Sequence, residues 1–316
     1  MTTARLGRSR GVNAQRPFGL TRALTGSLTA LTLGGCVAAA ELPTPQDPEA
    51  LCADSLAPGE VAVVADGFDA GTRGVVFSPS GRLFVSTADT IEEVETSGAH
   101  APVAQVAEVA GLAWWNGALT AISRDIGDGA GAVVHVDPDT SETSTFVQPL
   151  PGAESAASTP WRSLVVASPV ADQEIVEVSP SGGLDGFIQQ VPAPFGVAFS
   201  PDASAVWVTS SGLEPSLLRF PLDGEEPMQA AEVTSWPLGA GPSEVVVATL
   251  DGAVYAALAG EGRVVRLDPE TGEFTDLLRG VDGVTGLTFG TGPWDPCALY
   301  VTSPSSGELI AVGATR

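Results

Sequence analysis

A repeat of about forty residues, built of two short apolar runs joined by a tight turn, fills most of this chain. Clear copies read GVVFSPSGRLFVSTAD at 74–89, GLAWWNGALTAISRD at 111–125, GVAFSPDASAVWVTSSG at 196–212 and GLTFGTGPWDPCALYVTS at 286–303, and weaker copies occupy 161–182 and 243–274. Six copies, starting at 74, 111, 161, 196, 243 and 286, match the period of four-stranded propeller blades. The sequence therefore predicts an all-β fold, a six-bladed β-propeller of four-stranded blades.

The two ends of the repeat region are predicted to complete one blade together. The sixth copy ends after its third strand, ELIAVG at 308–313, while the apolar strand EVAVVADGF at 60–68 precedes the first copy. If this N-terminal strand becomes the fourth strand of the last blade, the ring closes and leaves no open sheet edge between its ends. We therefore place the propeller at residues 60–316.

The N-terminal segment has the charge order of a secretory signal, with arginines and no acid followed by the apolar stretch ALTGSLTALTLGG. This stretch is shorter than the roughly 20 apolar residues that span a bilayer. It ends in Leu-Gly-Gly-Cys, which resembles the lipobox of bacterial lipoproteins. The alternative is an ordinary cleaved signal with an unrelated cysteine. We predict a signal peptide at 1–35, then a lipidated Cys36 and a Pro-rich tether at 36–59, which anchor the protein to a membrane at the cell envelope.

Two further cysteines, Cys52 and Cys297, follow this segment. In an oxidising compartment such a pair is a disulfide candidate, whereas in the cytosol the two would be separate thiols. The predicted export signal favours the disulfide. Ring closure would bring Cys52, just before the N-terminal strand, next to Cys297 at the start of the second strand of the last blade, so we predict that the bond locks this blade.

Charge and residue types exclude several classes of function. The formal net charge is −24, and nucleic acid binding needs clustered positive charge, so no nucleic acid partner is expected. All 14 basic residues are arginines, which excludes Schiff-base chemistry, a Ser-Lys dyad and a phosphate loop ending in Gly-Lys-Ser/Thr. Gly-x-Ser-x-Gly occurs only as GRSRG at 7–11, inside the predicted signal peptide, and Cys-x-x-Cys does not occur. The two histidines, His100 and His135, cannot form a His-Glu-x-x-His zinc motif. We predict no catalytic residues from these motifs.

Three stretches resemble the gluconolactonase and senescence-marker-protein family of six-bladed propellers: GRVVRLDPETGEF at 262–274, APFGVAFSPDASAVWVTSSG at 193–212 and VTGLTFGTGPWDPCALYVTSPSSG at 284–307. The similarity covers most of residues 60–315. It implies lactone hydrolysis at one divalent cation, such as calcium, at the mouth of the central channel. The implied ligands are a Glu before the first inner strand, an Asn in a Pro/Ser-Asn-Gly turn and an Asp in a Pro-Asp-Gly turn.

The chain departs from this family pattern at all three implied ligand positions. The matching residues are Arg73 in TRGVVF, Phe195 in APFGVAF and Ser243 in GPSEVVV. An arginine repels a cation and a phenylalanine cannot bind one. Glu244, beside the third position, would be a ligand only if the alignment shifts by one residue. We therefore expect no metal cofactor, and a divalent cation such as calcium only if the protein is a hydrolase.

The loops that enter the inner strands, and those that join second to third strands, are predicted to meet at the channel mouth. Two interpretations stay open for the arginines in these loops: they hold an anionic or planar ligand between aromatic walls, or they form salt bridges that tie neighbouring loops together. The candidate ligand-binding residues are Arg73, Asp89, Arg124, Trp161, Arg162, Phe195 and Glu244, with Asp125 and Asp128 in the same loops.

We predict an exported, lipid-anchored propeller that acts as a ligand-binding or interaction module at the cell envelope, with a small anionic ligand or an envelope protein as its partner. The alternative is a gluconolactonase-like hydrolase with an altered site in the channel. The missing metal ligands favour the binding protein over the enzyme.

Overall fold

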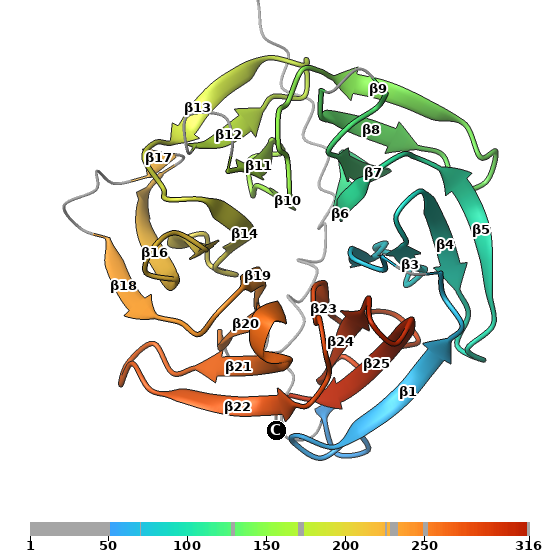
Figure 1. The fold of residues 1–316 in the computed structure, drawn as a ribbon, viewed down its shortest axis with the longest axis vertical. Helices are drawn as coiled ribbons and strands as arrows, with labels where there is room; N and C mark the ends of the chain where they lie inside the picture. Colours follow the sequence, from blue (N-terminus) through green and yellow to red (C-terminus); the bar gives the residue numbers. More distant parts are fainter. Residues whose placement is uncertain are drawn as a thin grey trace, which may run out of the picture. The chain divides into compact units, whose positions relative to one another are not determined.

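The computed structural model describes residues 51–69, 71–127, 130–169, 174–224, 226–227, 233–248 and 252–314. The predicted signal peptide at 1–35 and Cys36 lie outside these residues. Nearly all of the described secondary structure is β-strand, and the strands form six antiparallel sheets arranged in a ring (Figure 1). The prediction of an all-β, six-bladed propeller is confirmed. Within the described ranges, no helix is both long and apolar enough to span a membrane.

In the first three blades the chain runs from the inner strand to the outer strand. Blade 1 consists of β2 (Val75–Phe77), β3 (Leu83–Ser86), β4 (Thr90–Val94) and β5 (His100–Gln105). Blade 2 consists of β6 (Val109–Trp115), β7 (Ala118–Ser123), β8 (Ala132–Val136) and β9 (Thr143–Val147). Blade 3 consists of β10 (Ser155–Ser158), β11 (Leu164–Ser168), β12 (Glu174–Val178) and β13 (Leu184–Ile188).

The last three blades include two irregularities. Blade 4 consists of β14 (Pro194–Phe199), β15 (Ala205–Ser210), β16 (Ser216–Asp223) and β18 (Thr234–Pro237), with the short β17 (Glu226–Pro227) paired to the end of β16. Blade 5 consists of β19 (Pro242–Val247), β20 (Val254–Leu258), the 3-10 turn η2 (Ala259–Glu261), β21 (Arg263–Leu267) and β22 (Phe274–Arg279). Blade 6 consists of β23 (Leu287–Phe289), β24 (Ala298–Ser303), β25 (Glu308–Gly313) and, from the N-terminus, β1 (Val61–Asp66).

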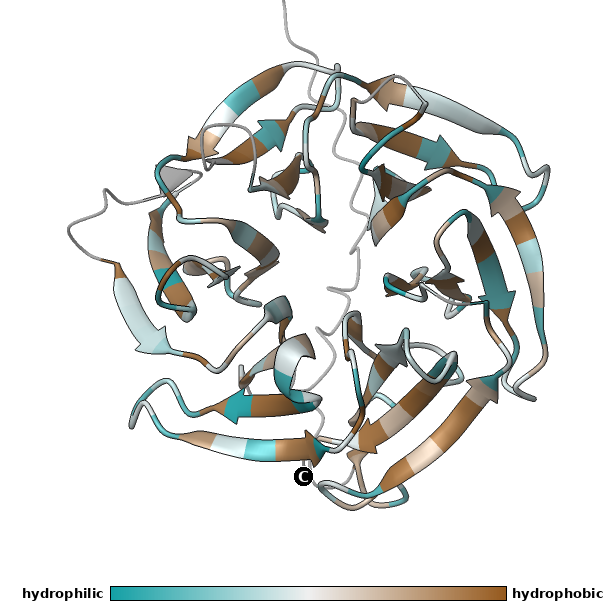
Figure 2. Ribbon diagram, in the orientation of Figure 1, coloured by the Kyte–Doolittle hydropathy of each residue, from teal (hydrophilic) through white to brown (hydrophobic). Residues whose placement is uncertain are grey.

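Burial decreases from the second strands to the outer strands. The second strands β3, β11, β15, β20 and β24 are buried along their whole length, because each blade packs between two neighbours. The outer strands β9 and β13 begin with exposed residues, and Figure 2 shows hydrophilic and hydrophobic residues mixed along the outer rim. Apolar runs in the sequence therefore correspond mainly to the inner half of each blade.

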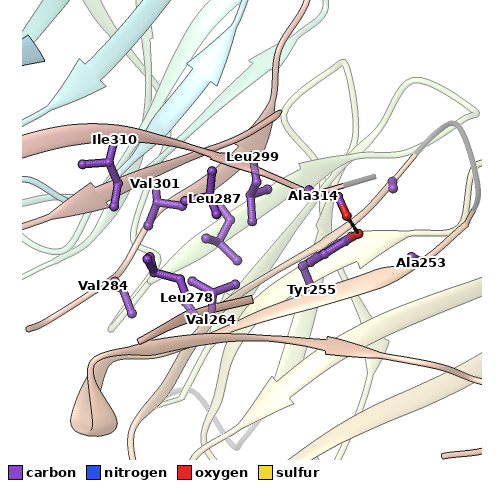
Figure 3. Packing of buried hydrophobic residues seen from close by; sticks show 13 residues of the cluster. Ala253, Tyr255, Val264, Leu278, Val284, Leu287, Leu299, Val301, Ile310 and Ala314 are labelled. Carbon is purple, nitrogen blue, oxygen red and sulfur yellow. Dashed lines mark hydrogen bonds between the residues drawn. The ribbon is translucent and has the colours of Figure 1, made fainter. Parts of the chain in front are cut away.

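Each pair of neighbouring blades shares a hydrophobic cluster. Figure 3 shows the cluster between blades 5 and 6, in which Tyr255 and Val264 pack with Leu287 and Leu299, and the Tyr255 hydroxyl donates to the Ala314 carbonyl at 3.1 Å. Comparable clusters join the other five pairs of blades. Because burial of one Leu or Val side chain stabilises a fold by about 1.5 to 3 kcal/mol, each blade depends on its neighbours for stability.

The ring closes in blade 6 as predicted. β1 pairs antiparallel with β25, with Val61 opposite Val312, so the N-terminal strand completes the last blade. Cys52 and Cys297 form a disulfide with their Cα atoms 5.7 Å apart. The predicted bond is confirmed, and it joins the segment before β1 to the start of β24.

The segment that precedes β1 also lies against blade 6. The Ser55 hydroxyl donates to Asp295 Oδ1 at 2.6 Å, and the Gly59 N–H donates to the Gly313 carbonyl at 2.8 Å. Residues 52–59, which the sequence places in the tether, therefore pack on the propeller.

His100 bridges the junction between blades 6 and 1. Its Nδ1 lies 2.5 Å from Glu92 Oε2, its Nε2 lies 3.0 Å from the carbonyl oxygen of Asp66 at the end of β1, and its ring stacks on Phe68. Burial acts to lower the pKa of His100, but the contacts with Glu92 and Asp66 raise it above its usual value. This histidine therefore fastens the closing strand to blade 1 and has no place in the channel.

The third blade starts earlier than the sequence predicts. Its inner strand is β10, whereas residues 161–163, at the predicted start of the blade, form the turn between β10 and β11. β10 has the sequence SAAS, so it lacks the apolar run by which the other inner strands are recognised. The remaining five inner strands begin close to their predicted positions.

Candidate functional site

One residue at the start of each inner strand lines the same cavity. These six residues, called the mouth ring below, surround a space of about 460 Å³ and are Arg73, Ala110, Glu154, Phe195, Ser243 and Thr285. Backbone hydrogen bonds indicate that these residues occupy equivalent positions in their blades. The N–H of Arg73 donates to the carbonyl of Ser86 on the second strand of blade 1. Glu154 and Thr285 make the same bond in their own blades.

The next residue of each inner strand forms a second layer beneath the mouth ring. Four of the six are glycines, and the layer consists of Gly74, Gly111, Ser155, Gly196, Glu244 and Gly286. The glycines are needed because the neighbouring blade lies too close for a side chain. A Cβ atom at Gly286 would lie 2.2 Å from the Arg73 carbonyl oxygen, and one at Gly196 would lie 2.7 Å from that of Ser243.

Two threonine hydroxyls hold the mouth ring in place from the neighbouring blade. Thr302 Oγ1 accepts from the Gly286 N–H at 2.8 Å and donates to the Arg73 carbonyl at 2.7 Å. Thr209 makes the matching donor contact with the Ser243 carbonyl at 2.9 Å. Arg73 and Ser243 are thus fixed by side chains of blades 6 and 4, so the positions of the mouth ring depend on the closed ring.

Arg73 is half-buried, and its side chain makes no ion pair or hydrogen bond with any residue that the structure describes. Burial and the nearby Arg124 lower the pKa of its guanidinium, while Glu154 and Glu108 act in the opposite direction. Because a guanidinium stays protonated at physiological pH, Arg73 places a positive charge beside the mouth cavity, with Glu154 and Glu108 nearby but with no hydrogen-bonded partner among the described residues.

Arg124 has a different environment, although it also lies at the mouth. Its Nε donates to Glu154 Oε1 at 3.0 Å, and its Nη2 pairs with Glu154 Oε2. Both side chains are mostly buried. The salt-bridge interpretation therefore holds for Arg124, which links blade 2 to blade 3. Arg73 remains the arginine of the mouth ring that is a candidate for binding a ligand.

Glu244 lies one residue below the mouth ring and reaches Ser155 of blade 3. The Ser155 hydroxyl lies 2.9 and 3.1 Å from the two carboxyl oxygens, and the Val245 N–H donates to Glu244 Oε1 at 3.0 Å. Burial raises the pKa of Glu244 to about 8, although both hydrogen bonds act to lower it. This carboxyl is therefore partly buried and engaged in an internal bridge.

The family's metal site does not fit this mouth ring. The structure brings the three matching positions together, since Arg73, Phe195 and Ser243 all line the one cavity. A hard cation such as calcium needs several oxygen ligands, and these side chains supply one hydroxyl beside a positive charge. Among the described residues, no group of three or more His, Cys, Asp or Glu side chains is placed to hold a metal ion.

The remaining acidic candidates lie in the loops around the mouth. Asp89 is exposed in the turn between β3 and β4, and its Oδ1 accepts from the Glu108 N–H at 3.1 Å. Asp125 accepts from the Gly127 N–H at 2.6 Å within its own turn. Asp128 lies outside the described residues. Asp89 and Asp125 thus shape loops, and neither lines the mouth cavity.

Trp161 and Arg162 lie at the opposite end of the inner strand, so the prediction that they reach the channel mouth is wrong. The error follows from the earlier start of blade 3. Trp161 Nε1 donates to Glu177 Oε1 at 2.7 Å and its ring packs edge-on against Phe199, while Arg162 is exposed and its carbonyl accepts from Trp115 Nε1 at 2.8 Å.

The sequence pattern does not identify three mouth-ring residues, Ala110, Glu154 and Thr285, and Glu154 is the charged one among them. It lies where the other blades carry Arg73, Phe195 or Ser243, directly before the second-layer position. The apolar pattern gave no sign of a strand here because β10 contains only Ser and Ala. An alignment of the six blades on the second layer would have found it.

A ring of six four-stranded blades, with a cavity at the entry to the inner strands, defines the class of six-bladed β-propellers. Within this class, residues 161–305 match the family model described as SMP-30/Gluconolactonase/LRE-like region. The resemblance read from the blade motifs is confirmed: the chain is a six-bladed propeller, and its residues 161–305 are similar to this family.

Solved structures with the same fold cover most of the chain. A gluconolactonase from Xanthomonas campestris has 14% identity and a TM-score of 0.68, over 80% of this chain and 89% of that one. Regucalcin from Agrobacterium tumefaciens, a calcium-binding protein, has 19% identity and a TM-score of 0.66, over 80% and 93%. A luciferin-regenerating enzyme has 14% identity and a TM-score of 0.63, over 80% and 94%. No curated protein sequence matches the chain. At these identities the likeness establishes the fold.

Proposed function

We propose that the channel mouth of this propeller binds a small anionic ligand. Arg73 carries the proposal: it is a half-buried cation that lines a cavity of about 460 Å³ and has no ion-pair partner among the described residues. A guanidinium forms paired, charge-assisted hydrogen bonds with a carboxylate or a phosphate. Phe195, on the same cavity, offers an apolar wall. The cavity has the size of a small-molecule site, which supports a small ligand over an envelope protein.

A lactonase-like hydrolase is the second candidate, because residues 161–305 match the gluconolactonase family model. The family resemblance assigns the chemistry to a cation, and the matching positions here are Arg73, Phe195 and Ser243. These side chains suit an anion better than a cation, which supports a binding function.

Replacing Arg73 by alanine should weaken anion binding strongly and leave stability almost unchanged. A hydrogen bond to a charged group contributes about 1.5 to 3 kcal/mol, so the affinity should fall about tenfold or more. We would measure thermal unfolding of the wild type and of Arg73→Ala, each with a panel of small carboxylates and phosphates. Arg162→Ala is the matched control. It removes the same charge from an exposed residue of blade 3, at the end of the blade that faces away from the channel mouth.

The expected result is stabilisation by at least one anion in the wild type and in Arg162→Ala, and much weaker stabilisation in Arg73→Ala. The proposal fails if no anion stabilises the wild type and Arg73→Ala melts at a lower temperature without ligand. Arg73 would then be a structural residue.

We also propose that the mature protein is held at the cell envelope by a lipid on Cys36. The signal-like segment at 1–35 supports export, and a disulfide between Cys52 and Cys297 suits an oxidising compartment. The full-length protein should then fractionate with membranes and incorporate labelled fatty acid in its host, whereas Cys36→Ser should do neither. Equal membrane association of the two proteins would contradict the anchor.

A further inference from the structure

Two cavities follow one another along the channel, and Glu244 is the one described residue that lines both. The mouth cavity of about 460 Å³ contains the mouth ring, and an inner cavity of about 290 Å³ is lined by the residues that follow on the inner strands, including Val75, Leu112 and Leu287. On each inner strand the mouth residue comes first, so the two cavities are successive levels of one channel. Glu244 lies at the level that divides them.

The second layer holds only two side chains larger than hydrogen, and these meet. Ser155 of blade 3 and Glu244 of blade 5 are linked by contacts of 2.9 and 3.1 Å, although blade 4 lies between their blades in the ring. The other four blades carry glycine at this level. The bridge between Ser155 and Glu244, called the floor below, thus extends from blade 3 to blade 5 beneath the mouth cavity.

We propose that this floor sets the length of the ligand: the mouth takes a short carboxylate on Arg73, and the bridge between Ser155 and Glu244 keeps a longer one out of the inner channel. The inference rests on the proposed anion site at Arg73. A ligand whose tail extends past the mouth must displace the Glu244 carboxyl and break its contacts with Ser155. The carboxyl also accepts a hydrogen bond from the Val245 N–H, so it is held from a second side.

Chain-length selection is the measurable consequence. A pocket that accepts or rejects one methylene changes affinity by about tenfold or more. We would titrate the purified mature protein by calorimetry with acetate, butyrate, hexanoate and octanoate. The wild type should bind the short carboxylates and lose at least about tenfold in affinity toward octanoate.

Three variants test whether the bridge between Ser155 and Glu244 limits the length of the ligand. Glu244→Gly gives blade 5 the residue that four other blades carry at this level, and Ser155→Gly removes the partner of the bridge. Either change should open the inner channel, and hexanoate and octanoate should bind about tenfold more tightly than to the wild type. Glu244→Gln keeps the size of the side chain and its hydrogen-bonding capacity, so it is the matched control and should keep the wild-type profile.

The outcomes distinguish the floor from the anion site itself. If the wild type binds acetate or butyrate through Arg73, but both glycine variants keep its chain-length profile, the floor is overturned and the anion site stands. If no carboxylate binds the wild type, the floor proposal fails, and the phosphates of the thermal-unfolding panel decide whether the anion site at Arg73 stands. If Glu244→Gly does not fold, Ser155→Gly provides the same test.

Discussion

Replacing both Cys52 and Cys297 by serine should lower the free energy of unfolding by on the order of 5 kcal/mol. The bond closes a loop across a sequence separation of 245 and thereby lowers the conformational entropy of the unfolded chain. Its removal raises that entropy and so favours the unfolded state. It also releases the segment that leads into β1, which closes the ring by pairing with β25. We would measure urea unfolding without reductant, in a Cys36→Ser background so that no third thiol can form other pairs.

The contrast with reduction provides the control for this prediction. Reductant should lower the stability of the disulfide-bonded protein to that of the serine variant, and should leave the serine variant unchanged. Equal stability of the oxidised protein and the serine variant would show that ring closure does not depend on this bond.

Gly286→Ala should destabilise the propeller by about 3 kcal/mol or more, because overpacking at a rigid contact forces the backbone to move. The added Cβ atom would lie 2.2 Å from the Arg73 carbonyl oxygen and 2.8 Å from Thr302 Oγ1. The first of these is backbone of the neighbouring blade and cannot rotate away. The measurement is the midpoint of chemical unfolding compared with that of the wild type.

Gly183→Ala is the matched control for this substitution. It adds the same methyl group in a turn of blade 3, where the nearest atom is the rotatable Ser179 hydroxyl at 3.0 Å. Its effect should stay within about 1 kcal/mol. If Gly286→Ala were as stable as this control, the glycine of the second layer would not be required for the short distance between blades 6 and 1. The structure described for the channel would then be wrong.

Much of the fold could be predicted from the sequence, because in four blades the inner strand and its turn carry a clear apolar pattern and in the fifth blade a weaker one. The closing strand could also be predicted, since the sixth copy lacks a fourth strand and an apolar strand at 60–68 was left over. Blade 3 could not be placed correctly. Its inner strand, SAAS, is held in place by antiparallel pairing with β11, and its sequence has no apolar run that would predict a strand.

The candidate site was predicted in part, and the errors have one cause. Arg73, Phe195 and Glu244 were placed at the mouth from the turns around them, and they line the cavity there. Trp161 and Arg162 were misplaced, and Glu154 was missed, because all three depend on where blade 3 begins. Contacts between blades, such as the pairing of Arg124 with Glu154 and of Ser155 with Glu244, join residues far apart in sequence and leave no local pattern.

We propose that the mouth ring holds an anion where the family resemblance implies a cation. Calorimetric titration of the mature, chelator-treated protein with calcium tests it most directly, with zinc and manganese alongside. We predict no saturable high-affinity binding to the wild type, and binding once Arg73→Glu, Phe195→Asn and Ser243→Asp together restore the implied ligands. Saturable calcium binding by the wild type, together with lactone hydrolysis that a chelator abolishes, would contradict the account and favour the hydrolase.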